Sequence, residues 1–295
     1  RIFGVIFDNA SLSENAQITI EANPNLLNKH WCKSLRSFGV NRISMGVQSF
    51  DNKKLRFLER AHTSKDIFKA LELASIFRDS SIDLIYGTPL DSKSLLKSEV
   101  AEAMKLPISH ISAYCLMQEN GAKNATKYAK LESKMKDSSP NLAQNQSKKT
   151  PALESIKLDS RDFDFCGDDG LKSSQMGEIV RNELAKHNFC QYEVSSFAKN
   201  IAGQISTKSV HNLSYWRGEE YLACGLLAVG RVGQCRYSGE DTLSSYIASP
   251  LSKQCEWLSA EDLAFERVFL GLRSEVGILL SVGLWKRILE ALEAK

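Results

Sequence analysis

The chain has 295 residues, of which 43% are hydrophobic and 25% are charged, and its formal net charge at pH 7 is +3. This is the composition of an ordinary globular protein, and the length suits one large α/β domain with a smaller second domain. So small a charge gives no reason to expect nucleic acid as a partner. No run approaches the ~20 apolar residues of a transmembrane helix, which leaves peripheral association with a membrane open.

Seven cysteines are spread along the chain, and no two of them form a C-x-x-C pair. An odd number at wide spacing is typical of reduced thiols in a cytoplasmic protein. We therefore expect free cysteines, a cytoplasmic location, and no zinc or iron–sulfur site made by this chain alone. The seven are Cys32, Cys115, Cys166, Cys190, Cys224, Cys235 and Cys255.

The first 116 residues alternate between short β-rich runs and segments with apolar residues at helical spacing. This alternation, with a unit of roughly 30 residues, predicts a parallel sheet with helical crossovers. The strands are expected at 17–24, 42–50, 81–87 and 110–116, and the helices at 25–39, 51–60, 64–77 and 94–107. We expect Asp51 and Ser64 to cap the second and third of these helices.

Three of the expected strands alternate apolar and polar side chains instead of being apolar on both faces. In 17–24, for example, Ile18 and Ile20 oppose Thr19 and Glu21. A flat doubly wound sheet buries apolar side chains on both faces, whereas a barrel with a polar lumen alternates in this way. The pattern therefore favours an α/β barrel, whose chemistry lies at the C-terminal ends of the strands.

The rest of the chain divides into a polar segment and a second ordered region. Residues 118–166 are rich in Lys, Ser, Asn and Gln, which predicts a mobile insertion. Residues 167–295 again show helix-like and strand-like patterns, including a helix that begins near Ser259, where Asp262 completes a capping box. We thus expect three regions, 1–117, 118–166 and 167–295.

Polar side chains near the ends of successive units form the first candidate site. Glu21, Gln48, Arg60 and Asp83 would converge at one rim if the strands form a barrel. Carboxylates and a carboxamide accept hydrogen bonds from ribose hydroxyls or an ammonium, and a guanidinium binds a carboxylate at two points. Together they suit a small zwitterionic, nucleoside-like ligand. Alternatively, each is a structural polar group, although structural need does not explain recurrence at one rim.

The stretch HNLSYW, residues 211–216, holds the second candidate site. Its imidazole, His211, either packs beside the aromatic residues and bonds a backbone carbonyl, or ligates a metal or heme iron as neutral imidazole. In the second case, Tyr215 and Trp216 would line a flat apolar ligand. The stretch alone does not decide between the two.

Seven stretches, taken in order, resemble one known family. The chain is similar to the radical S-adenosylmethionine proteins of the oxygen-independent coproporphyrinogen III oxidase group, and within that group to the heme chaperone branch. The resemblance implies a partial (β/α)6 barrel, of which the third to sixth strand units are present, followed by a smaller C-terminal α+β domain. The stretches are ITIEANP, RISMGVQSF, SIDLIYG, HISAY, QYEVSSFA, HNLSYW and FLGLR.

The resemblance also implies cofactors and site residues. Glu21, Gln48, Arg60 and Asp83 match the positions at which the family contacts S-adenosylmethionine, and Cys115 matches the position that packs the adenine with backbone. His211 matches the heme-iron ligand expected of the chaperone branch. The family also binds a [4Fe–4S] cluster through C-x-x-x-C-x-x-C.

The function implied is that of a heme chaperone, which binds heme and delivers it to heme-accepting proteins. One alternative is the oxidative decarboxylation of coproporphyrinogen III in porphyrin biosynthesis. Another is an inactive, truncated remnant. The sequence leaves the oligomeric state open.

The chain departs from the family pattern at several places. C-x-x-x-C-x-x-C and the Gly-rich GGGTP segment are both absent from it. We therefore expect an N-terminally truncated chain that does not bind the cluster by itself. Leu226 and Leu227 stand where the family has small residues, and Glu59 stands where a glycine usually precedes the arginine.

Overall fold

The computed structural model describes residues 2–116, 172–200 and 207–279. The chain forms two compact units: unit 1 comprises residues 1–191 and 195–207, and unit 2 comprises residues 192–194 and 208–295. The insertion expected at 118–166 and the helix expected at the C-terminal end lie outside the described residues.

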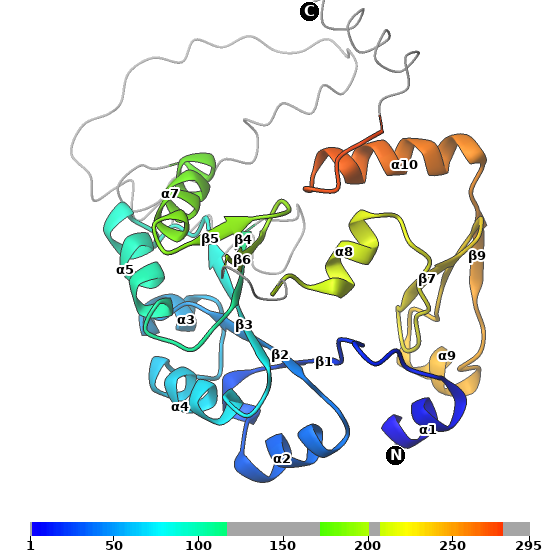
Figure 1. Ribbon diagram of the computed structural model, residues 1–295, viewed down its shortest axis with the longest axis horizontal. Coiled ribbons are helices and arrows are strands. Elements are labelled where there is room, and N and C mark those ends of the chain that lie inside the picture. The colour runs from blue at the N-terminus through cyan, green and yellow to red at the C-terminus, as the bar shows by residue number, and fades with distance from the viewer. Residues whose placement is uncertain (1, 117–171, 201–206, 280–295) are drawn as a thin grey trace, which may run out of the picture. The chain divides into compact units, whose positions relative to one another are not determined.

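Unit 1 is built on a six-stranded sheet (Figure 1). The first four strands pair in parallel, as the alternation of strands and helices predicts. The fifth strand in spatial order pairs antiparallel with the fourth, and the sixth pairs antiparallel with the fifth. The sheet is open, with β1 at one edge and β5 at the other. In spatial order the strands are β1 (Thr19–Ala22), β2 (Arg42–Gln48), β3 (Asp79–Tyr86), β4 (His110–Cys115), β6 (Ser196–Lys199) and β5 (Phe189–Gln191).

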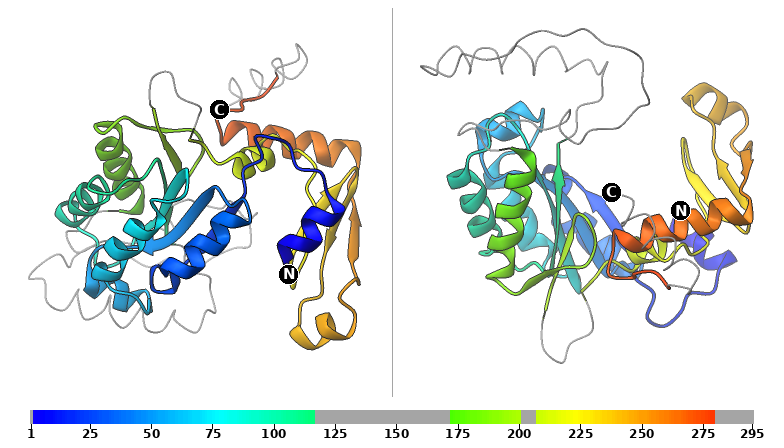
Figure 2. Two further views of the ribbon diagram at one scale, coloured as in Figure 1. Left: turned by 60° about the horizontal axis from the view of Figure 1, so that its bottom comes forward. Right: turned by 90° about the horizontal axis from the view of Figure 1, so that it is seen from above.

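Helices cover one face of this sheet (Figure 2). The strand residues that point toward them, such as Ile43, Met45, Ile82 and Ile111, are completely buried. They belong to one apolar cluster with side chains of the helices. These helices are α2 (Lys29–Ser37), α3 (Asn52–Phe57), α4 (Ser64–Ala74), α5 (Lys93–Ala103) and α7 (Ser173–Ala185); unit 1 also contains α1 (Ile2–Asn9) and the short turn η1 (Pro24–Leu26).

Side-chain caps fix where several of these helices begin. Asp51 caps α3, as predicted, by accepting a hydrogen bond from the Lys54 backbone N–H. For α4 the prediction was wrong by one residue. Thr63 is the N-cap and forms a capping box with Asp66, so Ser64 is the first helical residue.

Up to residue 279, where its description ends, unit 2 shows a three-stranded antiparallel sheet and three helices. The capping box of Ser259 and Asp262 at the start of α10 is present, as predicted. The sheet order is β7 (Val229–Val232), β8 (Cys235–Ser238) and β9 (Gln254–Trp257), and the helices are α8 (Val210–Trp216), α9 (Leu243–Ala248) and α10 (Ala260–Leu272).

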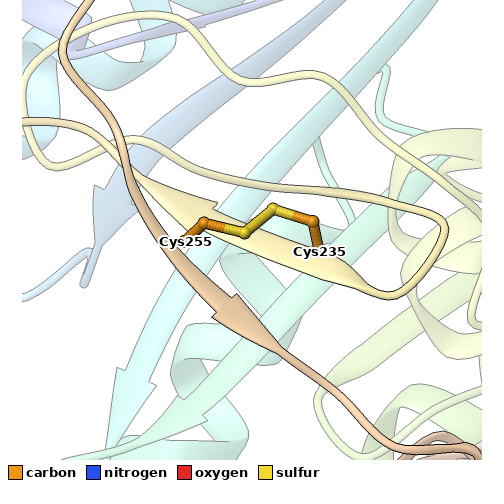
Figure 3. The surroundings of a disulfide bond; sticks show 2 residues. All are labelled: Cys235 and Cys255. Atoms are coloured by element: carbon orange, nitrogen blue, oxygen red, sulfur yellow. A yellow bond between two sulfur atoms is a disulfide. The ribbon is translucent and has the colours of Figure 1, made fainter.

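A disulfide bond joins Cys235 of β8 to Cys255 of β9 (Figure 3). The prediction that all cysteines are free thiols is wrong for this pair. Antiparallel pairing of β8 with β9 brings the two Cα atoms to 5.9 Å, a separation that a disulfide bridges without backbone movement. The sequence spacing of 20 residues gave no sign of this pairing.

The division into units differs from the regions expected from the sequence. Strands β5 and β6 and helix α7 were expected in the C-terminal region. In the structure β6 pairs with β4 and with β5, so these two strands complete the sheet of unit 1, and α7 belongs to the same unit. In the described part of the chain, no helix has the length and apolar character needed to cross a membrane.

Candidate functional site

The face of the unit 1 sheet that points away from the helices is polar. Parallel register places Glu21, Ser44, Ser81 and His110 in one row across the first four strands. Arg42 also lies on this face; its Nη2 donates a hydrogen bond to Ser81 Oγ at 2.9 Å, and Ser81 Oγ donates to Ser44 Oγ at 2.8 Å. The polar alternation read from the sequence therefore produces a continuous polar surface.

Asp83 lies on the same face, opposite Ser112 of β4. Burial raises the pKa of its carboxyl group to about 6, and the nearby Glu21 carboxylate adds to the shift. A hydrogen bond with Ser112 and the positive charge of Arg42 act in the opposite direction. Two of the predicted rim residues, Glu21 and Asp83, are thus close enough to influence each other electrostatically.

Gln48 ends β2 in a strained conformation, at an irregularity of the β2–β3 pairing. Its φ of +67° lies in the left-handed region that non-glycine residues seldom adopt. The amide of Gln48 lies over Gly46: a Cβ added at Gly46 would come within 2.8 Å of Gln48 Nε2 and 3.3 Å of Asn23 Oδ1. The missing side chain at Gly46 leaves room for two carboxamides beside the polar face.

A buried ionic cluster fixes the segment that follows Gln48. Lys54 is completely buried, and its Nζ contacts Asp91 Oδ1 at 2.7 Å and Glu99 Oε2 at 3.0 Å. Burial by itself lowers the pKa of Lys54, but the two carboxylates outweigh it and the pKa is raised. Glu99 also accepts hydrogen bonds from Ser49 Oγ and from the Phe50 backbone N–H. The cluster therefore joins the β2–α3 segment to α5 and to the loop before it.

The remaining two S-adenosylmethionine residues expected from the resemblance lie apart from these. Arg60 is exposed in the segment after α3, and in the described residues no hydrogen bond or ion pair joins it to Glu21, Gln48 or Asp83. Cys115 ends β4, and its Sγ lies beside Gly87, at 3.0 Å from the position that a Cβ would take there. Strand alternation directs this side chain away from the polar face, so only backbone at Cys115 is available to a ligand on that face.

Two functional candidates on the polar face were missed by the sequence reasoning. Arg42 is only 5% exposed and His110 only 1% exposed. Burial, followed by the charge of Arg42, lowers the pKa of His110 to about 3, so its imidazole is neutral at physiological pH. The alternation in RISMGVQ and HISAYC carried the signal, because it places both residues on the face of Ser81 and Asp83.

Unit 2 presents His211 on helix α8. The imidazole is exposed, and its ring meets the Tyr215 ring edge-on at a centroid distance of 4.6 Å. Tyr215 in turn meets Tyr221 edge-on at 4.5 Å. The packed alternative does not hold in its simple form, and the ligand alternative stays a prediction. His211 does contact an aromatic residue, but it is not buried and its imidazole remains accessible.

Trp216 does not share this arrangement. The Arg273 guanidinium lies 5.7 Å from the centre of its ring, in the range of a cation–π contact. The ladder of rings next to His211 thus consists of Tyr215 and Tyr221, and Tyr221 was not foreseen from the sequence.

Two substitutions noted in the sequence coincide with left-handed backbone. Glu59 has φ +57° and Leu227 has φ +58°. In the family that the chain resembles, a glycine is usual at the position of Glu59, and small residues are usual at the position of Leu227. Bulky side chains at these places cost conformational energy that glycine avoids.

Comparisons with known proteins agree with this geometry. Residues 3–97 match the family model of the Radical SAM superfamily. This region is thus similar to a radical SAM domain. The match ends within α5, so the matched region includes β1, β2 and β3 and the residues Glu21, Gln48, Arg60 and Asp83.

The chain is also similar to curated heme chaperones. It is 30% identical to the heme chaperone HemW of Lactococcus lactis subsp. lactis (strain IL1403), over 95% of this chain and 65% of that protein. It is likewise 30% identical to HemW of Bacillus subtilis (strain 168), over 90% of this chain and 62% of that protein. The chain thus spans less than two thirds of the length of these relatives.

A solved structure shares the fold. The coproporphyrinogen III oxidase HemN of Escherichia coli, described as a radical SAM enzyme, superimposes with a TM-score of 0.64 at 19% identity, over 93% of this chain and 59% of HemN. The open α/β sheet of unit 1 is therefore that of a HemN-like fold, and the expected fold class is confirmed.

The residues that the structure describes do not suit a [4Fe–4S] cluster. In the described parts of the structure, no three His, Cys, Asp or Glu side chains gather in a way that could hold a metal ion. Cys235 and Cys255 are bound to each other, and Cys32 is buried. No chemistry through a cluster is therefore assigned to these residues.

Proposed function

We propose that this chain holds heme through His211 and passes it to heme-accepting proteins. The observation that carries the proposal is the accessible imidazole at the start of α8, next to the edge-on rings of Tyr215 and Tyr221. A neutral imidazole ligates heme iron, and aromatic side chains offer a flat porphyrin an apolar wall. Similarity over most of the chain to relatives named heme chaperone supports the same function.

We further propose that the polar face of unit 1 holds S-adenosylmethionine. Its residues fit that ligand, since the Glu21 carboxylate and the Gln48 carboxamide accept hydrogen bonds from hydroxyl or ammonium groups. The missing side chain at Gly46 makes room for the Gln48 and Asn23 carboxamides beside this face. Arg60 would bind its carboxylate, and backbone at Cys115 would pack its adenine. When bound, S-adenosylmethionine supplies the sulfonium chemistry of this superfamily.

Asp83 has a separate part in this proposal. With a pKa of about 6, its carboxyl group carries a proton in about a tenth of the molecules at pH 7, and in more of them as the pH falls. It can therefore donate a hydrogen bond as well as accept one. This makes Asp83 suited to a ligand group that is itself an acceptor, such as a ribose oxygen.

Coproporphyrinogen III oxidation is the weaker candidate. The likeness to HemN is 19% in sequence and supports a common fold alone. No residue of the described chain points to decarboxylation.

The cytoplasmic location remains part of the proposal. The Cys235–Cys255 bond opposes it, because disulfides are rare in reducing compartments.

A heme titration tests the heme-holding function. The purified chain is titrated with ferric heme while the Soret band is followed, beside His211→Ala and the matched control His187→Ala, which removes another exposed imidazole. We expect saturable binding that is lost or at least tenfold weaker in His211→Ala only. Equal binding by all three proteins would contradict the proposal.

A further inference from the structure

Unit 2 contains a cavity of about 320 Å³ that extends beyond the proposed heme site and shares Tyr215 and Tyr221 with it. It lies among α8, α10 and the β7–β8 hairpin. Five α10 residues line it; four of them, Leu263, Glu266, Arg267 and Leu270, follow a spacing of three and four and so share one face of the helix, and Phe269 is the fifth. Tyr215 of α8 lines its opposite side. The volume is at the lower end of the range of small-molecule sites.

The aromatic ladder connects this cavity to His211. The ring of Tyr215 contacts His211 on one side and Tyr221 on the other, and both tyrosines line the cavity. His211 and Tyr215 are four residues apart on α8, so they lie on the same side of that helix. A planar ligand that reaches His211 along this side meets the cavity next.

Three arginines line the cavity, and two of them already have partners. Arg231 donates hydrogen bonds to the backbone carbonyls of Gly218, Glu219 and Gly233. Arg236 forms ion pairs with Glu256 and with Glu266. These contacts leave the first two guanidiniums little capacity for a ligand.

Arg267 differs from the other two. It is exposed, and no carboxylate within the described residues forms an ion pair with it. It also lines an adjoining cavity of about 970 Å³, together with Leu263 and the apolar side chains of Trp216, Val268 and Ile278. Arg267 is therefore a cation that stands between two partly apolar cavities. An uncharged apolar ligand would not use this guanidinium, whereas a carboxylate would pair with it at two points.

We propose that this cavity takes the carboxylate-bearing edge of a planar aromatic ligand, with Arg267 as the anion partner. The proposal rests on the proposed heme-holding function, because the propionate groups of heme are such carboxylates. It deepens that function by assigning the ligand two separate attachments, iron to His211 and carboxylate to Arg267. Arg236, held by Glu266, shapes the wall of the cavity and does not bind the ligand.

Three porphyrins separate the two attachments. Ferric heme offers both iron and carboxylates, iron-free protoporphyrin IX offers carboxylates alone, and the dimethyl ester of ferric heme offers iron alone. Each is titrated into the full chain and into Arg267→Gln, Arg267→Lys and the control Arg78→Gln. Arg78 is an exposed arginine of unit 1. Since Arg267 is exposed on a helix, its substitution leaves the fold essentially intact.

We expect Arg267→Gln to weaken the binding of protoporphyrin IX and of heme about tenfold, because one charge-assisted contact is lost. Binding of the dimethyl ester should not change. Arg267→Lys should lose less, because it keeps the charge but not the two-point geometry, and Arg78→Gln should match the unmodified chain. The inference is overturned if protoporphyrin IX does not bind, if it binds equally well to Arg267→Gln, or if the ester is weakened as much as the free acid.

Failure of the heme-holding function is distinguishable from failure of this inference. His211→Ala should leave protoporphyrin IX binding and its dependence on Arg267 unchanged, because that porphyrin has no iron. If heme binding is unchanged in His211→Ala but still weakened in Arg267→Gln, the assignment of His211 as iron ligand is wrong and the carboxylate site stands. If heme binding is weakened in His211→Ala but unchanged in Arg267→Gln, the iron ligand stands and the carboxylate site is wrong.

Discussion

The two units bury their apolar side chains to very different degrees. In unit 1, strand residues such as Ile43 and Ile82 and helix residues such as Ile67 are all completely buried in one cluster. In unit 2, every residue of β9 is exposed, Trp257 is 76% exposed, and Leu222 is 82% exposed. Apolar packing therefore supports unit 1.

Discrete links support the described part of unit 2 instead. The Cys235–Cys255 disulfide joins two strands, and the Arg236–Glu266 ion pair joins β8 to α10. The Lys208–Glu275 ion pair, at 2.6 Å, ties the segment before α8 to the segment after α10. In unit 1, apolar packing holds the polar face and the strained backbone at Gln48 in place. In unit 2, looser packing leaves the imidazole of His211 accessible.

The largest effect is expected from the buried cluster of unit 1. Lys54→Met leaves the Asp91 and Glu99 carboxylates buried without their ammonium partner, which should lower the free energy of unfolding by about 3–5 kcal/mol. Chemical denaturation measures it. The control Lys105→Met breaks an exposed pair with Glu102 and should cost less than about 1 kcal/mol. Equal costs would mean that the cluster does not stabilise unit 1.

The disulfide should have the next largest effect, confined to unit 2. Cys255→Ser removes a link between positions 20 residues apart, which should destabilise the unit by about 3 kcal/mol through the greater freedom of the unfolded chain. Hydrogen exchange measured peptide by peptide should become faster in β7, β8 and β9, whereas the exchange rates in β1 to β4 should not change. Cys190→Ser, at an exposed free thiol, serves as the control. Faster exchange in β1 to β4 as well would contradict an effect confined to unit 2.

Asp83 should make the stability of unit 1 depend on pH. Its pKa in the folded protein is about 6, above the ordinary value of 3.8, so the ionised form is disfavoured by folding. The cost is fully present above pH 6 and disappears as the pH falls through 6 toward 3.8. Asp83→Asn should therefore stabilise the protein by about 2 kcal/mol at pH 8 and not at pH 4.

Denaturation curves at the two pH values test this. The matched variant Asp79→Asn, at the start of the same strand, should show no such gain. A gain for Asp83→Asn that is the same at both pH values would show that ionisation of Asp83 is not its cause.

The smallest effects concern left-handed backbone in each unit. Glu59→Gly and Leu227→Gly should each stabilise by about 0.5 kcal/mol, the relief of the left-handed penalty less the entropy cost of glycine. Thermal unfolding measures the change. Asn188→Gly is the control, since asparagine adopts its φ of +63° at little cost. A larger gain at Asn188 than at Glu59 would refute the strain at Glu59.

The sequence predicted the four parallel strands because short β-rich runs that alternate with helical segments are a local pattern, and within three of these runs apolar and polar residues alternate as well. That same pattern correctly set Glu21 and Asp83 on one face, and the capping box of Ser259 is likewise local. The sequence could not show that β6 joins β4, because that pairing links residues 110–112 to 196–198 across the insertion.

Two further features depend on tertiary contacts alone. Lys54, in a segment reading NKKLRF, has the sequence of a solvated helix, and only the approach of Asp91 and Glu99 allows it to be buried. The Cys235–Cys255 bond likewise follows from strand pairing and not from spacing. Tyr221 and Arg267, which no motif marks, are brought beside α8 by the fold of unit 2.

The central claim is that His211 ligates heme iron. Electron paramagnetic resonance of the chain loaded with ferric heme tests it most directly, because the spectrum reports the axial ligand. The account predicts an imidazole-ligated spectrum for the unmodified chain and for His187→Ala. In His211→Ala this signature should be lost, and free imidazole should restore it. An imidazole signature that persists unchanged in His211→Ala would contradict the account.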